Sequence, residues 1–393
     1  MKIALFTNTY PPSVNGVANC THLYRRGLVA LGHEVHVFSP EPAYEDPFED
    51  DPFVHRYPSF RAPGEVDYML ALPLPFSLKV FARLLNLEVD LVHAQHPAWV
   101  GKWGRTHAKR NDAPLVSTAH AEYELFADRW LLPAPWVAPV VTRRVVRYYN
   151  RCQVVTTPVI STRQRLRESG VTSPIELVPN PVDLSGLADP DGAAVRKRLG
   201  IGEEDLVIGY LGRLSEEKNL PCVLQAARLM SRKHPNLQVL LVGDGPEADN
   251  LRRRARWERM EERVTFAGAV PHEEVHHYHD AMALFLTASG SETQPLAYTE
   301  AMYVGTPVVA LRTPGAQDML EDGVNGLLVD PARGAQGLAE AGERLVSDGA
   351  LRRKVCEGGR KFAEACSYVA VARRLEEVYQ QAQERYTAQR APA

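Results

Sequence analysis

Two glutamates eight positions apart, Glu292 and Glu300, form a carboxylate pair that could bind a polar ligand. Pro295 lies between them and fits the first turn of a helix that carries Glu300, which leaves Glu292 in the preceding loop. Helical rise throughout would separate the two by about 12 Å along the axis. A glycosidase needs its two carboxyls within about 5–9.5 Å. The pair therefore suits two hydroxyl-bearing parts of one extended ligand, such as a hexose and a ribose, although an isolated acidic pair is more commonly a solvated face.

Two cations five positions apart, Arg213 and Lys218, follow an apolar run that ends at Gly212 and precede a helical pattern. A departing diphosphate carries about two negative charges that must be neutralised while its bond to a sugar breaks. Arginine supplies a bidentate fork and lysine a mobile point charge, so together they could replace a metal ion. Taken alone, the same spacing would describe a solvated basic turn.

A third candidate is Gly16, in the loop that joins the first apolar run to the first helical pattern. A glycine at the start of a helix lets the backbone approach a phosphate oxygen at the positive helix end. A strand-to-helix turn that needs a small residue would look the same. The loop lacks the GxGxxG spacing, which disfavours a dinucleotide-dependent dehydrogenase.

The elements that position these residues alternate short apolar runs with amphipathic segments, the pattern of a parallel sheet covered by helices. Helical periodicity covers Val17–Leu31, Phe76–Leu87 and Val369–Arg385, and a further strand is expected near Val54. The expected strands are Lys2–Phe6, Glu34–Phe38, Leu91–His93, Leu115–Thr118, Val154–Thr156, Glu176–Val178, Leu206–Leu211, Gln238–Val242, Val264–Phe266, Ala283–Leu286, Val308–Leu311 and Leu327–Val329.

The alternation stops after Asp183 and restarts at Leu206, with a Pro-, Gly- and Asp-rich linker up to Gly192. We therefore expect an α/β chain of two Rossmann-like domains, residues 1–183 and 184–365, followed by a C-terminal helix, 366–393, that packs back on the first domain. Parallel sheets bind ligands at the carboxyl ends of their strands, so two such edges would face one another across an interdomain cleft.

Composition excludes several classes of protein. The 393-residue chain has a formal net charge of −3, which argues against a dedicated nucleic-acid binder. Its five cysteines form no CxxC pair and indicate reduced thiols in a cytoplasmic protein. The apolar run at the N-terminus is too short for a signal peptide, and no segment is long enough to span a membrane.

The stretch Trp130–Arg151 combines apolar anchors with the arginines 143, 144, 147 and 151. Apolar and basic residues side by side suit the inner face of an anionic cell membrane and would position a lipid acceptor. A core helix with a solvated basic face fits the same pattern equally well.

Two metal-binding patterns carry little weight. His272-Glu273-Glu274-Val275-His276 matches HExxH, but no third ligand follows at zinc-protease spacing. Val275, Tyr278 and Met282 are expected to face the core, with His272 and His276 near the helix edge. The DxD at Asp189-Pro190-Asp191 falls in the linker rather than at a strand end. No metal site is expected.

The ordered series of motifs resembles the retaining glycosyltransferases of family 4, which have the two-domain GT-B architecture. The resemblance covers about Met1 to Glu364. Besides the Glu292–Glu300 element, it rests on Tyr-Pro-Pro-x-x-Asn-Gly-Val at Tyr10–Val17, GHEVHVFSP at Gly32–Pro40, DLVHAQHP at Asp90–Pro97, STAHAEYE at Ser117–Glu124, LVPNPVD at Leu177–Asp183, GRLSEEKN at Gly212–Asn219, VGDGPE at Val242–Glu247 and NGLLV at Asn325–Val329.

The resemblance implies a role for each matching residue. It places the donor diphosphate on Gly16, Arg213 and Lys218. Glu292 would contact the hydroxyls of the donor sugar, Glu300 would contact the ribose, and the backbone around Val270 would contact the base. His120 would bond a sugar hydroxyl near the reacting carbon. Pro181 and Pro295 depart from the family pattern, and Pro295 removes one backbone amide that could serve the donor.

The implied activity is metal-independent, retaining transfer of a hexose from a nucleotide sugar, UDP-glucose being the expected donor type, to an acceptor hydroxyl. Members that glycosylate diacylglycerol or other membrane lipids are closest in character. The first domain would bind the acceptor and the second the donor. A nucleotide-sugar epimerase, a phosphorylase and a catalytically silent sugar-nucleotide-binding regulator remain alternatives on the same fold.

Overall fold

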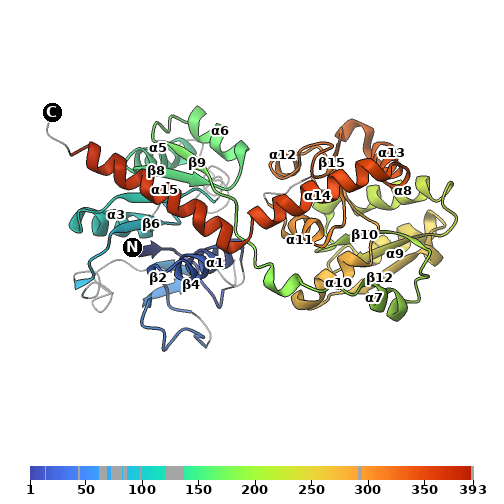
Figure 1. Cartoon of the computed structure of the whole chain (residues 1–393), viewed down its shortest axis with the longest axis horizontal. Coiled ribbons are helices and arrows are strands. Elements are labelled where there is room, and N and C mark those ends of the chain that lie inside the picture. Colours follow the sequence, from blue (N-terminus) through green and yellow to red (C-terminus); the bar gives the residue numbers. More distant parts are fainter. Residues whose placement is uncertain are drawn as a thin grey trace. The chain divides into compact units, whose positions relative to one another are not determined.

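The computed structural model describes residues 1–13, 15–42, 45–61, 69–71, 82, 86–97, 99–120, 137–290 and 294–390. The chain divides into two units (Figure 1). Unit 1 comprises Met1–Pro181 and Tyr368–Ala393, and unit 2 comprises Val182–Ser367. The two segments by which the chain enters and leaves unit 2 are joined by an isolated β-bridge. In it, the amide of Val182 donates to the carbonyl of Cys366 at 2.8 Å.

Unit 1 is built on a parallel sheet with the strand order β3-β2-β1-β6-β7-β8-β9. A separate antiparallel pair, β4 and β5, was not predicted from the sequence. The strands are β1 (Lys2–Phe6), β2 (Glu34–Pro40), β3 (Val54–Tyr57), β4 (Ser59–Arg61), β5 (Met69–Ala71), β6 (Leu91–Ala94), β7 (Leu115–Thr118), β8 (Val154–Thr157) and β9 (Ile175–Leu177). The predicted helix Phe76–Leu87 lies largely outside the described residues.

Helices cover both faces of this sheet, and the period-two alternation of β1 divides the core between them. Ala4 and Phe6 pack with α3 (Trp99–Arg110) and α5 (Val137–Tyr149). Ile3 and Leu5 pack on the other face with α1 (Gly16–Ala30) and α15 (Tyr368–Ala388). The remaining helix of the described part of unit 1 is α6 (Ile160–Glu168).

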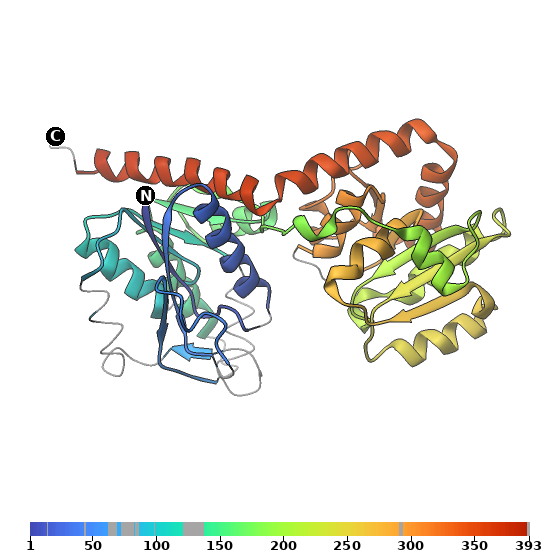
Figure 2. The same ribbon diagram turned by 60° about the horizontal axis from the view of Figure 1, so that its bottom comes forward.

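The C-terminal helix α15 lies directly along α1 (Figures 1 and 2). The contact is closest at Gly27, where a Cβ atom would overlap the carbonyl oxygen of Tyr368 and lie 2.7 Å from the Cβ of Ala372. Only glycine lets the two backbones approach this closely. The last segment of the chain therefore completes the core of unit 1.

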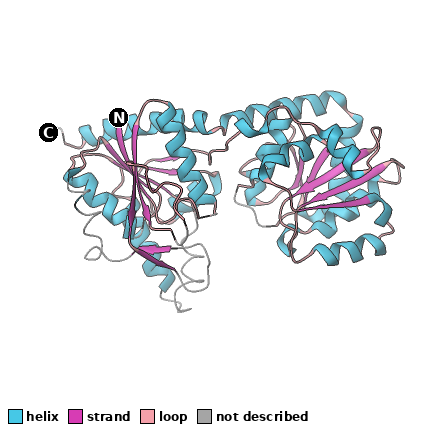
Figure 3. Ribbon diagram, turned by 90° about the horizontal axis from the view of Figure 1, so that it is seen from below, coloured by secondary structure: helices cyan, strands magenta, loops and turns pink. Residues whose placement is uncertain are grey.

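Unit 2 repeats the design with six parallel strands in the order β12-β11-β10-β13-β14-β15. Figure 3 shows the strands of each unit with helices on either side. The strands are β10 (Leu206–Leu211), β11 (Leu237–Val242), β12 (Val264–Gly268), β13 (Leu284–Thr287), β14 (Val308–Leu311) and β15 (Leu327–Val329). The helices are α7 (Gly192–Leu199), α8 (Leu220–Met230), α9 (Ala248–Trp257), α10 (Val275–Asp280), α11 (Leu296–Val304), α12 (Pro314–Gln317), α13 (Gly334–Ser347) and α14 (Gly349–Ala365), with 3-10 turns η2 (Ser185–Leu187), η3 (Glu216–Lys218), η4 (Glu261–Arg263), η5 (His272–Glu274) and η6 (Pro331–Arg333).

Local signals explain where several of these helices begin and end. Asp191 and Asp348 cap α7 and α14, since each carboxylate accepts a hydrogen bond from a first-turn amide. Gly200 ends α7 at φ 70°, a conformation that costs glycine little. No helix within the described ranges is long and apolar enough to cross a membrane.

The strand orders place ligand-binding edges in both units. In each sheet the order reverses next to the first strand, between β1 and β6 in unit 1 and between β10 and β13 in unit 2. Loops that leave the carboxyl ends of strands on either side of such a reversal diverge and leave room for a ligand. The loops after β1 and β6, and those after β10 and β13, are therefore the candidate sites, and the loops after β7 and β12 leave the same edges of the sheets.

Candidate functional site

The loop after β1 places Gly16 at the first residue of α1, as predicted. Asn15 caps this helix by accepting from the amide of Ala18 at 2.9 Å, and its side-chain amide donates to Thr9 Oγ1 at 2.7 Å. A Cβ on Gly16 would meet nothing within 4 Å. The space beside this helix N-terminus is therefore open, and first-turn amides there can face an anion.

His120 follows β7 at the same edge of the sheet and bonds to a residue that the sequence analysis did not single out. Its Nε2 lies 2.7 Å from Oε1 of Gln95, which directly follows β6. Burial lowers the pKa of His120 to about 4. The imidazole is therefore neutral at physiological pH.

A second histidine, His96, shares this surrounding. Its ring centroid lies 6.4 Å from that of His120, and its Nδ1 accepts from the amide of Asn8 at 3.4 Å. Burial, reinforced by the neighbouring His120, lowers the pKa of His96 to about 3. The described part of this edge therefore presents neutral polar groups.

A chain of buried hydrogen bonds lies one layer below this edge. His93 bonds through Nδ1 to the Tyr379 hydroxyl at 2.8 Å and through Nε2 to Thr118 Oγ1 at 2.7 Å. Thr118 in turn bonds to Thr156 at 2.7 Å. Strands β6, β7 and β8 are thereby tied to α15 two residues before Gln95 and His120 leave the sheet.

In unit 2, the loops after β10 and β11 lie backbone against backbone. Leu214 donates to the carbonyl of Asp244 and Glu247 donates to the carbonyl of Leu214, both at 2.9 Å. A Cβ on Gly243, whose φ is 128°, would overlap the carbonyl oxygen of Gly212. Glycine is therefore required at this contact, which fixes the start of the loop that carries Arg213 and Lys218.

Arg213 and Lys218 both lie on this loop, Arg213 exposed and Lys218 half-buried in η3. Glu217 lies on the same loop, and its pKa is lowered by the hydrogen bond from Ser215, with Lys218 and Arg213 contributing less. The carbonyl of Glu217 accepts from the amide of Gly290 at 3.0 Å. The basic loop is thus joined to the loop after β13, whose residue Glu292 lies outside the described residues.

Glu300 lies in α11, as predicted, and is 3% exposed. Pro295 is the residue immediately before the helix, which begins at Leu296. The Glu300 carboxylate lies 3.8 Å from His272 Nδ1 and 3.7 Å from His279 Nε2. Neither ring nitrogen of the fully buried His279 has a hydrogen-bond partner within the described structure. Glu300 is thus a buried carboxylate with the imidazoles of His272 and His279 beside it.

Val270 follows β12 at the same edge and is half-buried against the unit 2 core. Its backbone forms no hydrogen bond to another described residue. A free amide and carbonyl on an exposed loop can bind the edge of a heterocyclic base. Unit 2 therefore brings Arg213, Lys218, Val270 and Glu300 to the carboxyl edge of one sheet.

The HExxH pattern does not form one α-helix. His272 and Glu273 lie in η5, and α10 begins only at Val275. Val275, Tyr278 and Met282 are buried as expected. The expectation that His276 lies near the helix edge is wrong, because it is 5% exposed. Among the described residues, no three His, Cys, Asp or Glu side chains are grouped to hold a metal, and the DxD aspartate Asp191 is the cap of α7.

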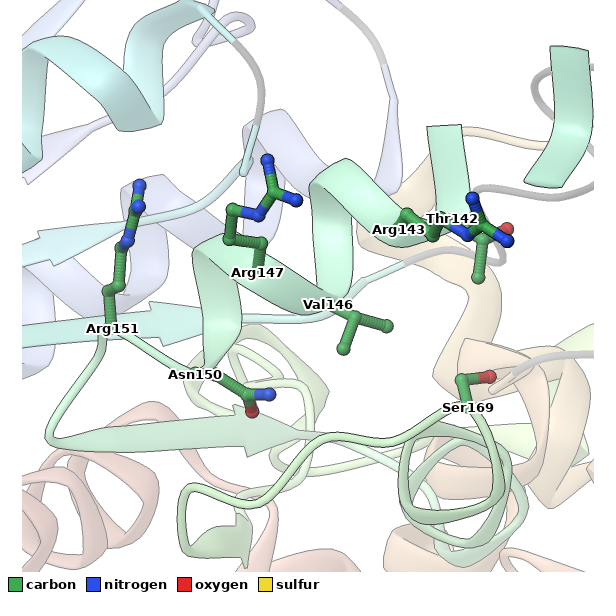
Figure 4. A pocket seen from close by; sticks show the side chains of 7 residues that line it. All are labelled: Thr142, Arg143, Val146, Arg147, Asn150, Arg151 and Ser169. Carbon is green, nitrogen blue, oxygen red and sulfur yellow. The ribbon is translucent and has the colours of Figure 1, made fainter. Parts of the chain in front are cut away.

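The described part of the predicted membrane-facing stretch is α5 with Asn150 and Arg151. Trp130 to Trp136 lie outside the described residues. Tyr148 and Tyr149 of α5 are buried, whereas Arg143, Arg144 and Arg147 are exposed. Arg143, Arg147 and Arg151 line one open hollow of about 460 Å³. Figure 4 shows these three side chains one after another. The other residues that line the hollow are Thr142, Val146, Asn150 and Ser169, and none is acidic.

The sequence analysis missed Gln95 and His96, although both lie within the motif that it quoted at Asp90–Pro97. The available signal was position, since polar residues that directly follow a buried strand lie at the ligand-binding edge. What no pattern could supply was the contact with His120, which is 25 residues away in the chain.

Two Rossmann-like units, with a basic loop and a buried carboxylate on one ligand-binding edge, are the arrangement expected of a nucleotide-sugar-dependent glycosyltransferase of the GT-B fold. Family models agree along the chain. Residues 14–185 match the model described as Glycosyltransferase Family 4, and residues 192–362 match that described as Glycosyl transferases group 1.

Relatives are similar over most of their length. The chain is 27% identical over 337 residues to an alpha-monoglucosyldiacylglycerol synthase from Acholeplasma laidlawii, covering 83% of this chain and 84% of that protein. It is 27% identical over 358 residues to a GDP-mannose-dependent alpha-mannosyltransferase from Corynebacterium glutamicum, covering 88% and 81%. The solved structure of Anabaena Alr3699/HepE in complex with UDP matches with a TM-score of 0.74 at 21% identity, covering 97% and 100%. The chain belongs to glycosyltransferase family 4 and is a retaining hexosyltransferase.

Proposed function

We propose that the protein transfers a hexose from a UDP-linked donor to a hydroxyl of a membrane glycerolipid. Unit 2 binds the donor and unit 1 binds the acceptor. The observation that carries the proposal is the carboxyl edge of unit 2, where the exposed Arg213 and the half-buried Lys218 share one edge with the buried carboxylate of Glu300. A nucleoside diphosphate presents a dianion and a ribose diol, and these side chains are complementary to the two parts.

The proposed donor pose assigns one group to each part of the ligand. The diphosphate accepts hydrogen bonds from Arg213 and Lys218 and meets the N-terminus of α1 at Gly16. The ribose hydroxyls donate to Glu300, and the base meets the backbone at Val270. Glu292 bonds the hydroxyls of the transferred sugar, and His120 bonds a further hydroxyl near the reacting carbon.

The chemistry follows from this pose. Arg213 and Lys218 stabilise the negative charge that grows on the leaving diphosphate as the glycosidic bond breaks. The departing phosphate helps to deprotonate the acceptor hydroxyl, which attacks from the same face and retains the configuration.

A lipid acceptor and attachment to the membrane surface are supported by the arginine face of α5 and by the Acholeplasma relative, whose name gives a glucosylated diacylglycerol as its product. The UDP-linked donor is supported by the bound UDP of the Anabaena structure. The Corynebacterium relative uses GDP-mannose, so the test must include both nucleotides.

The test is incubation with a panel of UDP- and GDP-hexoses and cell lipids, followed by mass spectrometry of the products. Hexose added to a glycerolipid from a UDP donor is the expected outcome. Epimerised donor, sugar phosphate or no turnover would replace the proposal by an epimerase, a phosphorylase or a silent binding protein, respectively.

Catalysis is expected to need no divalent metal, because Arg213 and Lys218 supply the cationic charge. Exhaustive chelation should leave most of the activity, and Lys218→Ala should lower kcat about 100- to 1,000-fold, the loss typical for one transition-state donor. Substitution of both His272 and His276 by Gln should be tolerated. Activity lost on chelation and restored by zinc or manganese would contradict this mechanism.

A further inference from the structure

The carboxyl edge of unit 1 holds a buried amide nitrogen with no protein partner. Gln95 is 0% exposed, and its Nε2 has no hydrogen-bond partner among the described residues. Leaving such a buried donor without a partner is unfavourable. Gln95 lies on the loop that follows β6, at the edge where parallel sheets of this type bind ligands. A substrate oxygen is the natural partner for it.

The other end of the same amide fixes the chemistry of His120. A carbonyl oxygen only accepts, so the 2.7 Å contact with Gln95 Oε1 requires that His120 Nε2 carries the proton. In a neutral imidazole, Nδ1 then holds the lone pair. Burial keeps the ring neutral because it lowers the pKa of His120 to about 4.

We propose that Gln95 and His120 form one hydroxyl-binding subsite, in which Gln95 Nε2 donates to a substrate oxygen and His120 Nδ1 accepts from a substrate hydroxyl. Gln95 is thereby a substrate-binding residue and also the residue that sets the tautomer of His120. This assignment rests on the proposed function, since the hydroxyls belong to the sugar that is transferred.

The pairing of one donor with one acceptor selects the ligand class. A sugar hydroxyl can both accept and donate, so adjacent hydroxyls satisfy the two groups together. A phosphate dianion offers only acceptors and would face the lone pair of His120 Nδ1 unfavourably. The neighbouring imidazole of His96 is also neutral, so it supplies no compensating positive charge. The subsite is therefore suited to bind a neutral polyol rather than the diphosphate.

Two substitutions separate these roles. Gln95→Met keeps the volume and removes both hydrogen bonds, and we expect kcat/KM to fall about 10- to 100-fold. Gln95→Glu keeps the acceptor for His120 Nε2 and removes the donor. Its carboxylate also stabilises the imidazolium and raises the pKa of His120. The activity of this variant should therefore fall as the pH is lowered through the raised pKa, a limb that the wild-type protein lacks in that range.

Deoxy donors identify the hydroxyl concerned. If Gln95 donates to one sugar oxygen, removal of that hydroxyl should cost the wild-type protein about tenfold in kcat/KM and cost Gln95→Met nothing further. Binding of free UDP, measured by calorimetry, should be unchanged in both variants because UDP carries no hexose. Gln153→Glu is the matched control, since Gln153 precedes β8 at the opposite end of the strands and should leave activity unchanged.

The tautomer is tested without turnover. In the wild-type protein, nitrogen NMR of labelled histidine should show His120 protonated at Nε2, and a titrated hexose donor, but not UDP, should shift its Nδ1 signal. A proton on Nδ1, deoxy donors that lose equally in both proteins, or UDP binding that is lost with Gln95 would overturn the subsite. A wild-type protein that transfers no hexose while this NMR pattern holds would reject the proposed function and leave the subsite standing.

Discussion

The residues at the two ligand-binding edges differ in charge, and the difference follows from burial. In unit 1, burial keeps His93, His96 and His120 neutral by lowering their pKa values to about 3, 3 and 4. In unit 2, the side chains of Arg213 and Lys218 are accessible to solvent. A neutral polyol suits the first edge and a diphosphate the second, which matches the parts of a nucleotide sugar with its acceptor.

Glu300 gives a prediction at the scale of a single residue. It is expected to hold the ribose, a part of the donor that changes little during reaction, so its loss should weaken donor binding more than the chemical step. Glu300→Gln should raise the donor KM and weaken binding of free UDP about 10- to 100-fold, the range expected for hydrogen bonds to a charged group. Calorimetric titration with UDP measures this directly.

Glu292→Gln is the informative comparison for that experiment. Glu292 is expected to bond the transferred sugar, so this variant should bind UDP normally and lose about 10- to 100-fold in kcat, equivalent to roughly 1.4–2.7 kcal/mol of barrier. The exposed Glu261→Gln should change neither quantity. UDP binding lost in the Glu292 variant and kept in the Glu300 variant would mean that the donor lies the other way round.

At the scale of the elements, the sequence was sufficient where a structure depends on local patterns. Every expected strand is present to within two residues at either end, because buried parallel strands read as short apolar runs bounded by turn residues. The pair β4–β5 was missed because Ser59–Arg61 and Met69–Ala71 are too short to show a period. The contact between Gln95 and His120 was missed because it depends on which strands are neighbours, and no local pattern encodes that.

The packing of α15 on α1 gives a prediction for this pair of helices. Alanine is the better helix former, so Gly27→Ala would stabilise an isolated helix by about 0.5–1 kcal/mol. Here the new Cβ would overlap the Tyr368 carbonyl, and overpacking of this kind costs about 1–3 kcal/mol. The urea midpoint of unfolding should fall. The control is Gly349→Ala at the start of α14. A Cβ there would lie 3.6 Å from a guanidinium nitrogen of Arg353, an ordinary contact, so this change should not lower the urea midpoint. Equal stability of the two variants would mean that α15 moves aside freely.

The buried layer under unit 1 makes stability depend on pH. His93 has a pKa of about 3 in the folded chain against about 6.5 when unfolded, so between about pH 3 and 6.5 the unfolded chain binds the proton and the folded chain does not. The free energy of unfolding should therefore decrease as the pH is lowered through this range, by about 1.4 kcal/mol per pH unit for each such histidine.

The comparison of His93→Gln with the wild-type protein isolates one of these protons. The variant will be less stable at pH 7.5, since Tyr379 and Thr118 lose their shared partner. As the pH is lowered from 7 to 5, its free energy of unfolding should nevertheless decrease less steeply than that of the wild-type protein. The difference in slope is the contribution of the one proton that His93 would bind. Urea titrations at several pH values measure both quantities. Parallel pH profiles for the two proteins would mean that His93 is protonated in the folded chain.

At the scale of the whole molecule, charge is distributed unevenly. The chain carries a formal net charge of −3, so an anionic surface repels it on average. Unit 1 nevertheless presents Arg143, Arg147 and Arg151 along one hollow with no acidic residue in its lining. A second hollow, which shares Asn150 and Arg151 with the first, is lined in addition by Arg105, Lys109 and Arg385. The proposed attraction to an anionic membrane is therefore local, and we assign it to this basic surface.

The corresponding prediction is that the whole chain binds vesicles containing phosphatidylglycerol through α5. Each basic residue near such a surface contributes about 1 kcal/mol. Replacement of Arg143, Arg144 and Arg147 by Gln should therefore weaken binding at least 100-fold. Raising the salt concentration to 1 M, where the screening length is about 3 Å, should have a similar effect on the wild-type protein. Sedimentation with vesicles of increasing anionic content measures both effects.

The control replaces Arg252, Arg253 and Arg256 of α9, which removes the same charge from unit 2 and should leave binding intact. If both triple variants lose binding equally, overall charge governs the attraction. If neither loses binding, or if the wild-type protein does not bind, α5 is a core helix with a solvated arginine face.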